Sequence, residues 1–350
     1  MNGDSNTKVL LVKRPGTGMP DASLFKIVEE PIPEPADGQF VVKNVYLSLD
    51  PAMRGWMNDV KSYIAPVKLG DVMRGQTVGQ VIASKNPKFR VGDLVSGIGG
   101  WQKYAVADGK RGGWEKLVPG FAPTLFLGVL GGTGITAYFG LLRVGLPKAG
   151  ETVLVSGAAG AVGSVVGQIA KIKGCRVVGI AGSDEKCKWL VDELGFDAVV
   201  NYKGKSADQL NDEIRQACPK GVDVFFDNVG GDILDVALKR IRKGARIVIC
   251  GAISQYNAAQ TKGPANYLSL LVHSARMEGF VLFDYIPEYP LAIRELGQWV
   301  KEGKLKYAEE VVEGLERAPE YLNMLFTGAN KGKLIVKLAD EPAQFAQARL

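Results

Sequence analysis

Three glycines between an apolar segment and an amphipathic one carry the first recognisable chemistry of this sequence. In VLVSGAAGAVG, an expected strand from Val153 to Ser156 runs into Gly157, Gly160 and Gly163, and an expected helix from Ala161 to Lys173 follows. Small residues at such a turn let backbone N–H groups approach a pyrophosphate, and the helix N-terminus adds its positive dipole end. Because a second apolar strand, RVVGIAG, comes next, the pattern predicts a dinucleotide-binding turn.

The end of that second strand distinguishes NAD from NADP. An acidic side chain there would hydrogen-bond the ribose 2′-OH and repel a 2′-phosphate, but the strand ends in Gly182 and Ser183. Ser183, Lys186 and Tyr202 offer hydroxyl and ammonium groups suited to a 2′-phosphate. Asp184 argues the other way, although an acid at this place is more simply an N-cap or first-turn residue. We therefore predict NADPH; the alternative is that Lys186 is only a solvated helix residue.

Metal chemistry has few candidate ligands. The cysteines are widely spaced and form no C-x-x-C pair; they are Cys175, Cys187, Cys218 and Cys250. The single histidine, His273, lies in the stretch NYLSLLVHSARM, which we expect to be helical. One histidine cannot build a catalytic zinc site by itself, so we predict reduced, mostly buried thiols and no metal.

Two kinds of element have to position these residues. Residues 1–125 contain short β segments broken by Pro and Gly, whereas apolar strands alternate with amphipathic helices from Leu125 onward. We expect an α/β protein: a Rossmann NADPH-binding domain, residues 126–304, with a doubly wound parallel sheet of about six strands, and a β domain, residues 1–125, completed by 305–350. The further expected helices are Asp184 to Leu194, Ala207 to Cys218, Asp232 to Arg242 and Ala292 to Glu302, and RIVICG and MEGFVLF are the last strands of the sheet.

Length and composition agree with this division. A chain of 350 residues with 46% apolar content is long enough for two cores. It has no run approaching the roughly 18 apolar residues of a membrane span and no signal-peptide pattern, so we expect a cytoplasmic protein. The net charge of +6 is interspersed, and neither nucleic acid nor a membrane is an expected partner.

Several stretches, in order along the chain, carry a resemblance. They are NVYLSLDPAMRGWM, GVLGGTGITAYFGLL, VSGAAGAVGSVVGQIAK, GIAGSDEKC, FDNVGG, CGAISQYN, GFVLFDY and TGANKGKLIVKL. Over nearly its full length the chain resembles the zinc-independent medium-chain dehydrogenase/reductases, and most of all their alkenal and enone reductases. This group includes the leukotriene B4 12-hydroxydehydrogenase/15-oxoprostaglandin 13-reductases and the curcumin reductases. The resemblance implies a GroES-like first domain, a homodimer, and an active site in the cleft between the domains.

The resemblance also implies roles for individual residues. For the cofactor these are Thr136, Gly157, Gly160, Ala161, Val162, Gly163, Ser183, Lys186, Tyr202, Asn228, Cys250, Gly251, Ser254, Tyr256, Phe280, Val281, Leu282 and Asn330. For the substrate pocket they are Tyr46, Ala52, Met53, Arg54 and Phe283. Relatives commonly have D-P-Y-M-R where this chain has Asp50 to Arg54, so Ala52 removes an aromatic wall and could widen the pocket.

The implied reaction moves a hydride from nicotinamide C4 to the β-carbon of an α,β-unsaturated aldehyde or ketone. Negative charge then develops on the carbonyl oxygen, and Tyr256 is the best candidate donor to it. The alternative for Tyr256 is a loop aromatic that packs over the cleft. Tyr46 is a weaker candidate that could equally be a core or pocket-wall residue, and Arg54 either faces the cleft or caps the SLDPAMR turn.

Two other functions fit the same sequence. An NADPH:quinone oxidoreductase would share fold and cofactor but present a different acceptor. A non-catalytic NADPH-binding or sensing protein is the second alternative, because no charged catalytic residue is obligatory. The substrate of a reductase is a small molecule in either enzymatic case.

Overall fold

The computed structural model describes residues 5–348, and these form two compact units, residues up to 128 with 309 onward, and residues 129–308. The sequence placed the boundaries slightly earlier, at 125/126 and 304/305. The first boundary moves because Gln76 Nε2 donates to the carbonyl oxygen of Phe126 at 3.2 Å, which ties this segment to the first unit. The second moves because Lys306 and the side chain of Gln168 exchange two hydrogen bonds, at 2.7 and 2.8 Å, within the second unit.

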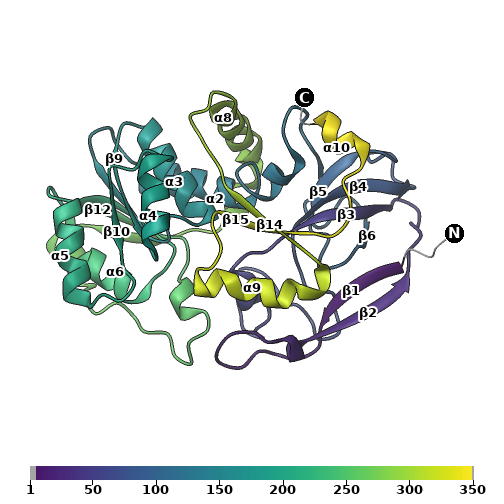
Figure 1. Cartoon of the computed structure of the whole chain (residues 1–350), viewed down its shortest axis with the longest axis horizontal. Helices are drawn as coiled ribbons and strands as arrows, with labels where there is room; N and C mark the ends of the chain where they lie inside the picture. The colour runs from purple at the N-terminus through teal and green to yellow at the C-terminus, as the bar shows by residue number, and fades with distance from the viewer. Residues whose placement is uncertain (1–4, 349–350) are drawn as a thin grey trace. The chain divides into compact units, whose positions relative to one another are not determined.

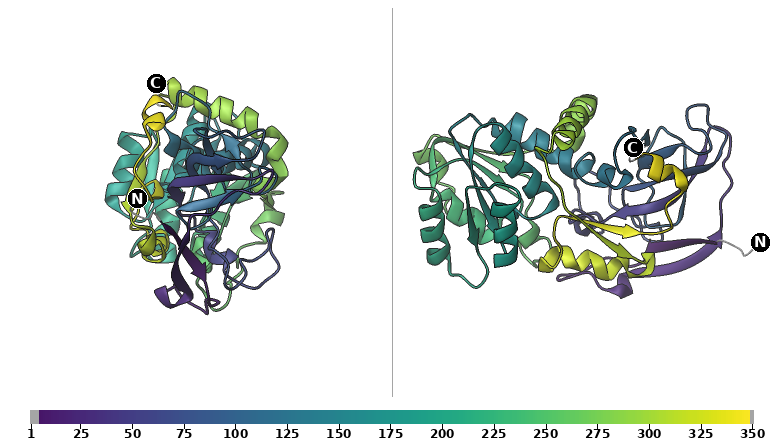
Figure 2. Two further views of the ribbon diagram at one scale, coloured as in Figure 1. Left: turned by 90° about the vertical axis from the view of Figure 1, so that its right-hand side faces the viewer. Right: turned by 45° about the horizontal axis from the view of Figure 1, so that its top comes forward.

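The first unit is a GroES-like β domain. Its sheet has the strand order β14-β15-β3-β4-β5-β7, with β6 paired to β3. These strands are β3 (Phe40–Ser48), β4 (Thr77–Ser84), β5 (Leu94–Gly97), β6 (Tyr104–Ala107), β7 (Glu115–Lys116), β14 (Glu309–Glu313) and β15 (Lys333–Lys337). A separate antiparallel ribbon of β1 (Ser5–Leu11) and β2 (Phe25–Pro31) is drawn in purple in Figure 2.

The C-terminal segment completes this sheet. After β14 the chain forms α9 (Ala318–Thr327), and β15 then runs antiparallel to β3, with Ile335 opposite Ser48. Strand β3 is buried along almost its whole length, and its residues belong to two apolar clusters, one that contains Phe40 and one that contains Leu47. Two short helices, α1 (Met53–Trp56) and α10 (Ala343–Ala348), also belong to this unit.

The second unit is a Rossmann domain, as the alternating pattern predicted. Six parallel strands take the order β10-β9-β8-β11-β12-β13. They are β8 (Thr152–Val155), β9 (Arg176–Ala181), β10 (Ala198–Asn201), β11 (Val222–Asp227), β12 (Ile241–Ile249) and β13 (Arg276–Gly279). Strands are added on one side from β8 to β10 and on the other from β11 to β13, so the order reverses between β8 and β11. In such sheets this switch point is where ligands bind.

Helices cover both faces of the Rossmann sheet. They are α2 (Gly132–Phe139), α3 (Ala161–Ile172), α4 (Asp184–Asp192), α5 (Ala207–Ala217), α6 (Gly231–Leu238), α7 (Ser269–Val272) and α8 (Tyr289–Lys301). Helix α2 packs against α3 and α8, and α5 packs against α6 (Figure 1). None of the helices in the described residues is long and apolar enough to cross a membrane.

Two element boundaries differ from the expectations. The helix predicted from Asp232 to Arg242 ends at Leu238, because the chain already lies beside β11 at residues 240–241, where the N–H of Val222 donates to the carbonyl oxygen of Arg240. The strand predicted for MEGFVLF ends at Gly279, and a 3₁₀ helix, η5 (Leu282–Glu288), follows. It ends there because Phe280 turns toward the domain interior and packs against Gly140 and Phe226.

Candidate cofactor site

In the glycine turn, the backbone after β8 and the backbone at the start of α3 approach each other closely. Gly157 has a φ of +57°, a left-handed conformation that favours glycine. A Cβ on Gly163 would stand 2.4 Å from the carbonyl oxygen of Gly157, so only glycine permits this approach. The N–H of Ala158 donates to the carbonyl oxygen of Ile180 at 3.0 Å and fixes the turn against β9.

The N-terminus of α3 suits an anion. Gly160 is its N-cap residue, and no side chain caps the helix. The first backbone N–H groups of a helix have no intrahelical acceptor, and here they belong to Ala161, Val162 and Gly163. These N–H groups and the helix dipole together attract a phosphate. The residues predicted for the pyrophosphate therefore lie on one turn.

The residues predicted for a 2′-phosphate also lie together. Ser183 is the N-cap of α4, and its Oγ accepts the N–H of Lys186 at 3.3 Å, which leaves the hydroxyl proton for another acceptor. Tyr202 follows β10, which pairs with β9. A Cβ on Gly182 would stand 3.2 Å from Tyr202 Oη, so the ring lies directly over the end of β9.

Asp184, the argument against NADPH, is in the first turn of α4. Its Oδ1 accepts a hydrogen bond of 2.7 Å from Asn201 Nδ2. The carboxylate thus joins the helix start to the end of β10, as expected for a first-turn acid.

A buried carboxylate that the sequence analysis missed occupies the switch point. Asp227, the last residue of β11, is 1% exposed, and its Oδ1 accepts the hydroxyl of Ser156 at 2.6 Å and the N–H groups of Val229 and Gly230 at 3.0 and 3.1 Å. Burial raises the pKa of the carboxyl, and the hydrogen bonds from Ser156, Gly230 and Val229 oppose that rise. The available signal was an acid at the end of the apolar run VDVFFD.

Three residues predicted for the nicotinamide are hydrogen-bonded to Asp227 or to its partner Ser156. Asn228 donates its N–H to Ser156 Oγ at 2.8 Å and its Nδ2 to the Ser156 carbonyl oxygen at 2.7 Å. The N–H groups of Cys250 and Gly251 both donate to the carbonyl oxygen of Asp227, at 2.9 and 3.1 Å. The ends of β8, β11 and β12 are therefore held in one network.

Tyr256 lies over the end of β12. Its hydroxyl oxygen accepts the N–H of Ala252 at 3.2 Å and stands 2.9 Å from where a Cβ on Gly251 would be. The hydroxyl oxygen thus acts as the acceptor in that bond. Ser254, on the same loop, donates its hydroxyl to the carbonyl oxygen of Val229 at 2.6 Å. Both residues belong to the loop that follows the strand-end network.

The remaining predicted residues of the Rossmann domain are more scattered. Thr136 donates its hydroxyl to the carbonyl oxygen of Gly132, one turn earlier in α2, at 2.6 Å. Phe280 packs inward, Val281 and Leu282 are half-buried, and Phe283 is exposed.

The residues predicted in the GroES-like domain are mostly engaged in its own packing. Tyr46 donates its hydroxyl to Glu341 Oε1 at 2.7 Å, and its ring stacks on Phe345. Met53 is fully buried in an apolar cluster. Arg54 donates to the carbonyl oxygen of Gly16 at 2.7 Å and to Asn58 Oδ1 at 2.8 Å. Ala52 is half-buried, and Asn330, 9% exposed, donates to the carbonyl oxygen of Gly332 at 3.1 Å.

Tyr46 and Met53 therefore pack as core residues, the alternative that the sequence left open for Tyr46. Arg54 joins the 16–18 loop to the end of α1. Their predicted places in a substrate pocket stay predictions.

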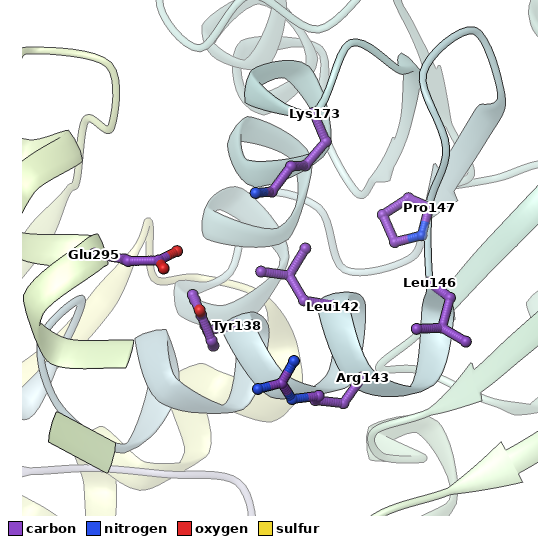
Figure 3. A pocket seen from close by; sticks show the side chains of 7 residues that line it. All are labelled: Tyr138, Leu142, Arg143, Leu146, Pro147, Lys173 and Glu295. Atoms are coloured by element: carbon purple, nitrogen blue, oxygen red, sulfur yellow. The ribbon is translucent and has the colours of Figure 1, made fainter. Parts of the chain in front are cut away.

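A cavity of about 400 Å³ in the Rossmann domain lies apart from these residues. It is lined by Tyr138, Leu142, Arg143, Leu146, Pro147, Lys173 and Glu295 (Figure 3). Burial, followed by the charge of Glu295 and a hydrogen bond with it, raises the pKa of Tyr138 to about 12. The cavity contains none of the residues predicted for cofactor or substrate, and we assign it no chemistry.

Comparison with known proteins settles the family. Residues 7–114 match a family model described as the N-terminal domain of oxidoreductase, and residues 161–298 match one described as zinc-binding dehydrogenase. The chain is 42% identical to the NADPH-dependent curcumin reductase of Escherichia coli, over 96% of this chain and 98% of that protein. It is 40% identical to the NADP(+)-dependent 2-alkenal reductase of Nicotiana tabacum, over 97% of this chain and 100% of that protein.

The chain belongs to the medium-chain dehydrogenase/reductase family. Within that family it falls in the zinc-independent alkenal and curcumin reductase group.

A solved member of the group has the same fold. CurA from Vibrio vulnificus, in complex with NADPH, superposes on this medium-chain reductase with a TM-score of 0.89. The two chains are 43% identical, over 96% of this chain and 100% of that one. A likeness of this degree covers both domains.

One of the two matching family models is described as zinc-binding, which raises the question of zinc ligands in this medium-chain reductase. Among the described side chains, no group of three or more His, Cys, Asp and Glu could hold a metal ion. His273 Nδ1 pairs with the carbonyl oxygen of Ser269 at 2.9 Å. No step of the reaction is therefore assigned to a metal.

The thiols are protected by burial. Cys175, Cys187 and Cys218 are buried and Cys250 is half-buried, and none of them forms a disulfide. Burial raises the pKa of Cys175 to about 11 and that of Cys218 and Cys250 to about 12. Burial also raises the pKa of Cys187. All four remain protonated at neutral pH.

Proposed function

We propose that this protein reduces the carbon–carbon double bond of α,β-unsaturated aldehydes and ketones with NADPH. The observation that carries the proposal is the uncapped N-terminus of α3 behind a glycine turn, with Ser183 and Tyr202 grouped at the end of β9. The related proteins named for curcumin and 2-alkenals, both NADP-dependent, support the choice of cofactor and acceptor.

The chain's own groups would hold the two ends of the cofactor differently. The N–H groups of Ala161, Val162 and Gly163 would bind the pyrophosphate. The Ser183 hydroxyl, the Lys186 ammonium and the Tyr202 hydroxyl would bind the 2′-phosphate through charge-assisted hydrogen bonds. We further propose the predicted contacts of Asn228, Cys250, Gly251, Ser254, Thr136, Phe280–Leu282 and Asn330 with the cofactor.

The chemistry that bound NADPH supplies is hydride transfer from nicotinamide C4 to the β-carbon of the acceptor. Electron density then moves to the carbonyl oxygen, where Tyr256 would donate its hydroxyl proton as a hydrogen bond. A well-placed donor to such an oxygen lowers the barrier by about 3 kcal/mol. A proton from Tyr256 or from water would then add to the α-carbon and complete the saturated carbonyl product.

A substrate screen tests this function. Purified protein is given NADPH with an enal, an enone or a simple quinone; NADPH consumption is followed at 340 nm, and products are identified by mass spectrometry. We expect turnover of the enal and enone to saturated carbonyls and, because the Tyr256 donor is lost, a lower kcat in Tyr256→Phe. Turnover of the quinone alone would favour the quinone oxidoreductase. NADPH binding without any turnover would favour the binding protein.

We also propose that two copies of the chain pair through β13. This strand is an edge of the Rossmann sheet, and an exposed edge strand is a template for pairing with another chain. The residues just before it are unusually exposed for their type: Leu271 is 77% and Val272 76% exposed. A partner copy would cover this apolar surface.

Oligomeric state tests that proposal. We expect a dimer by light scattering for the wild type and a shift to monomer for Leu271→Asp, since a charge would have to be buried in the interface. Val311→Asp, at an exposed apolar residue of the other domain, is the control that should stay dimeric. A monomeric wild type would contradict the proposal. A cytoplasmic location stays a prediction from the sequence.

A further inference from the structure

Two buried aspartates tie the same pair of strands together at opposite ends. Near the start of β11, Asp223 Oδ2 accepts the N–H of Thr152, the first residue of β8, at 2.8 Å. At the end of β11, Asp227 Oδ1 accepts the hydroxyl of Ser156 at 2.6 Å. Asp223 is 7% exposed and Asp227 1%. Only Asp227 is at the carboxyl ends of the strands, where an open α/β sheet binds its ligand.

Asp227 does more than pair two strands. Its carboxylate accepts the N–H groups of Val229 and Gly230, which fixes the turn before α6. Its carbonyl oxygen accepts the N–H groups of Cys250 and Gly251, which fixes the end of β12. One residue thus sets the relative position of three loops at the switch point.

Ser156 connects Asp227 to the glycine turn. Its hydroxyl donates to Asp227 and accepts the N–H of Asn228, and the next residue is Gly157. A displacement of Asp227 would therefore move Gly157 and Asn228 together. The side chain of Asp223 has no comparable connection, because its other partner is Arg242, whose side chain is half-exposed.

We propose that Asp227, acting through Ser156, is a positioning residue for NADPH. The inference rests on the proposed function only in naming NADPH as the ligand. All side-chain partners of Asp227 in the described structure are donors, so the site needs an acceptor-only group. In Asp227→Asn the amide NH₂ would face one of these donors. The turn before α6 and the Ser156 hydroxyl, which share this carboxylate, would then have to shift relative to each other.

The matched pair Asp227→Asn and Asp223→Asn tests the role. NADPH is titrated into each purified full-length variant, and its Kd is read from cofactor fluorescence. Because the amide NH₂ of the variant would face a buried N–H donor at the cofactor site, we expect the Kd of Asp227→Asn to rise about tenfold. We expect Asp223→Asn to stay within about twofold of the wild type. Both variants should unfold at a lower temperature.

Equal effects of the two substitutions on the Kd, or no effect of Asp227→Asn, would overturn the inference, because both are what a merely structural tie predicts. If Asp227→Asn does not fold, Ser156→Ala takes its place, with the same expected rise in Kd and the same contradicting result. The experiment measures NADPH binding. A wild type that binds NADPH but reduces no enone would therefore contradict the proposed reaction without contradicting the positioning role of Asp227.

Discussion

In the proposed site, Lys186 is the residue whose charge would bear most directly on the choice between NADPH and NADH. It lies in the first turn of α4, beside the Ser183 cap and near the end of β9, where Tyr202 covers Gly182. These three residues are close in sequence to predicted strand ends, and their grouping follows from local chemistry. That is why the sequence alone could predict them.

We expect Lys186→Ala to raise the KM for NADPH about tenfold, because a charge-assisted hydrogen bond to the 2′-phosphate is lost. The KM for NADH, which has no such phosphate, should change by no more than about twofold. Steady-state kinetics with each cofactor measures both constants. Lys188→Ala is the control: its side chain is 79% exposed and pairs with Asp192 in the same helix. Equal effects on NADPH and NADH would remove the 2′-phosphate assignment.

Other residues were beyond prediction because their partners are far away along the chain. Asp227 and Ser156 are 71 residues apart, and nothing local in FDNVGG indicates that the aspartate accepts a serine hydroxyl. Tyr46 and Glu341 are 295 residues apart, so the hydrogen bond that engages the tyrosine was equally hidden. Such pairs depend on strand register, which a single sequence specifies only weakly.

Helix α3 has two glycines on the same face that contact different parts of the domain. Gly163 faces the glycine turn, and Gly167, one turn later, faces Phe196, where a Cβ would stand 2.0 Å from a ring carbon. The first contact belongs to the cofactor site and the second to the core. Substituting each in turn separates the two contributions.

We expect Gly163→Ala and Gly167→Ala each to lower the free energy of unfolding by about 1–3 kcal/mol, because both add a methyl group where none fits. Urea unfolding measures this loss. Only Gly163→Ala should also weaken NADPH binding, since it pushes α3 away from the turn that receives the pyrophosphate. A similar loss of affinity in both variants would mean that the whole helix, rather than its N-terminus, governs binding.

Element order was predictable, and element ends were less so. Apolar strands that alternate with amphipathic helices predict the parallel sheet, and the structure confirms it. The π-helix η3 (Gly140–Gly145), by contrast, has no sequence signature. Its last carbonyl groups are bound by Arg246 from β12 and Arg276 from β13, more than a hundred residues later. Tertiary partners of this kind decide where helices end.

For the whole molecule, chain length predicted two cores, and the change from β segments to alternating strands and helices predicted their kinds. All four cysteines lie in the Rossmann domain, where three are buried and Cys250 is half-buried. Their raised pKa values set how the protein responds to alkaline pH.

We expect the native protein to resist iodoacetamide at pH 8, because burial raises the pKa of all four thiols, to about 11 for Cys175 and about 12 for Cys218 and Cys250. In the unfolded chain the thiols ionise near 9.0, so the native state holds more protons between these values and stability falls as the pH rises through that range. Labelling followed by mass spectrometry, with and without urea, counts modified cysteines. Rapid labelling of Cys250 in the native protein would contradict the expectation.

The burial of the thiols also affects how well a reductase of this kind would resist alkylation by its own substrates. Conjugated enals are Michael acceptors, and thiolates are the groups in proteins that they alkylate most readily. A reductase that meets these molecules at every turnover would be poisoned through any ionised cysteine near the acceptor. If the proposed function holds, a neutral Cys250 thiol beside the end of β12 would give the bound electrophile little thiolate to react with.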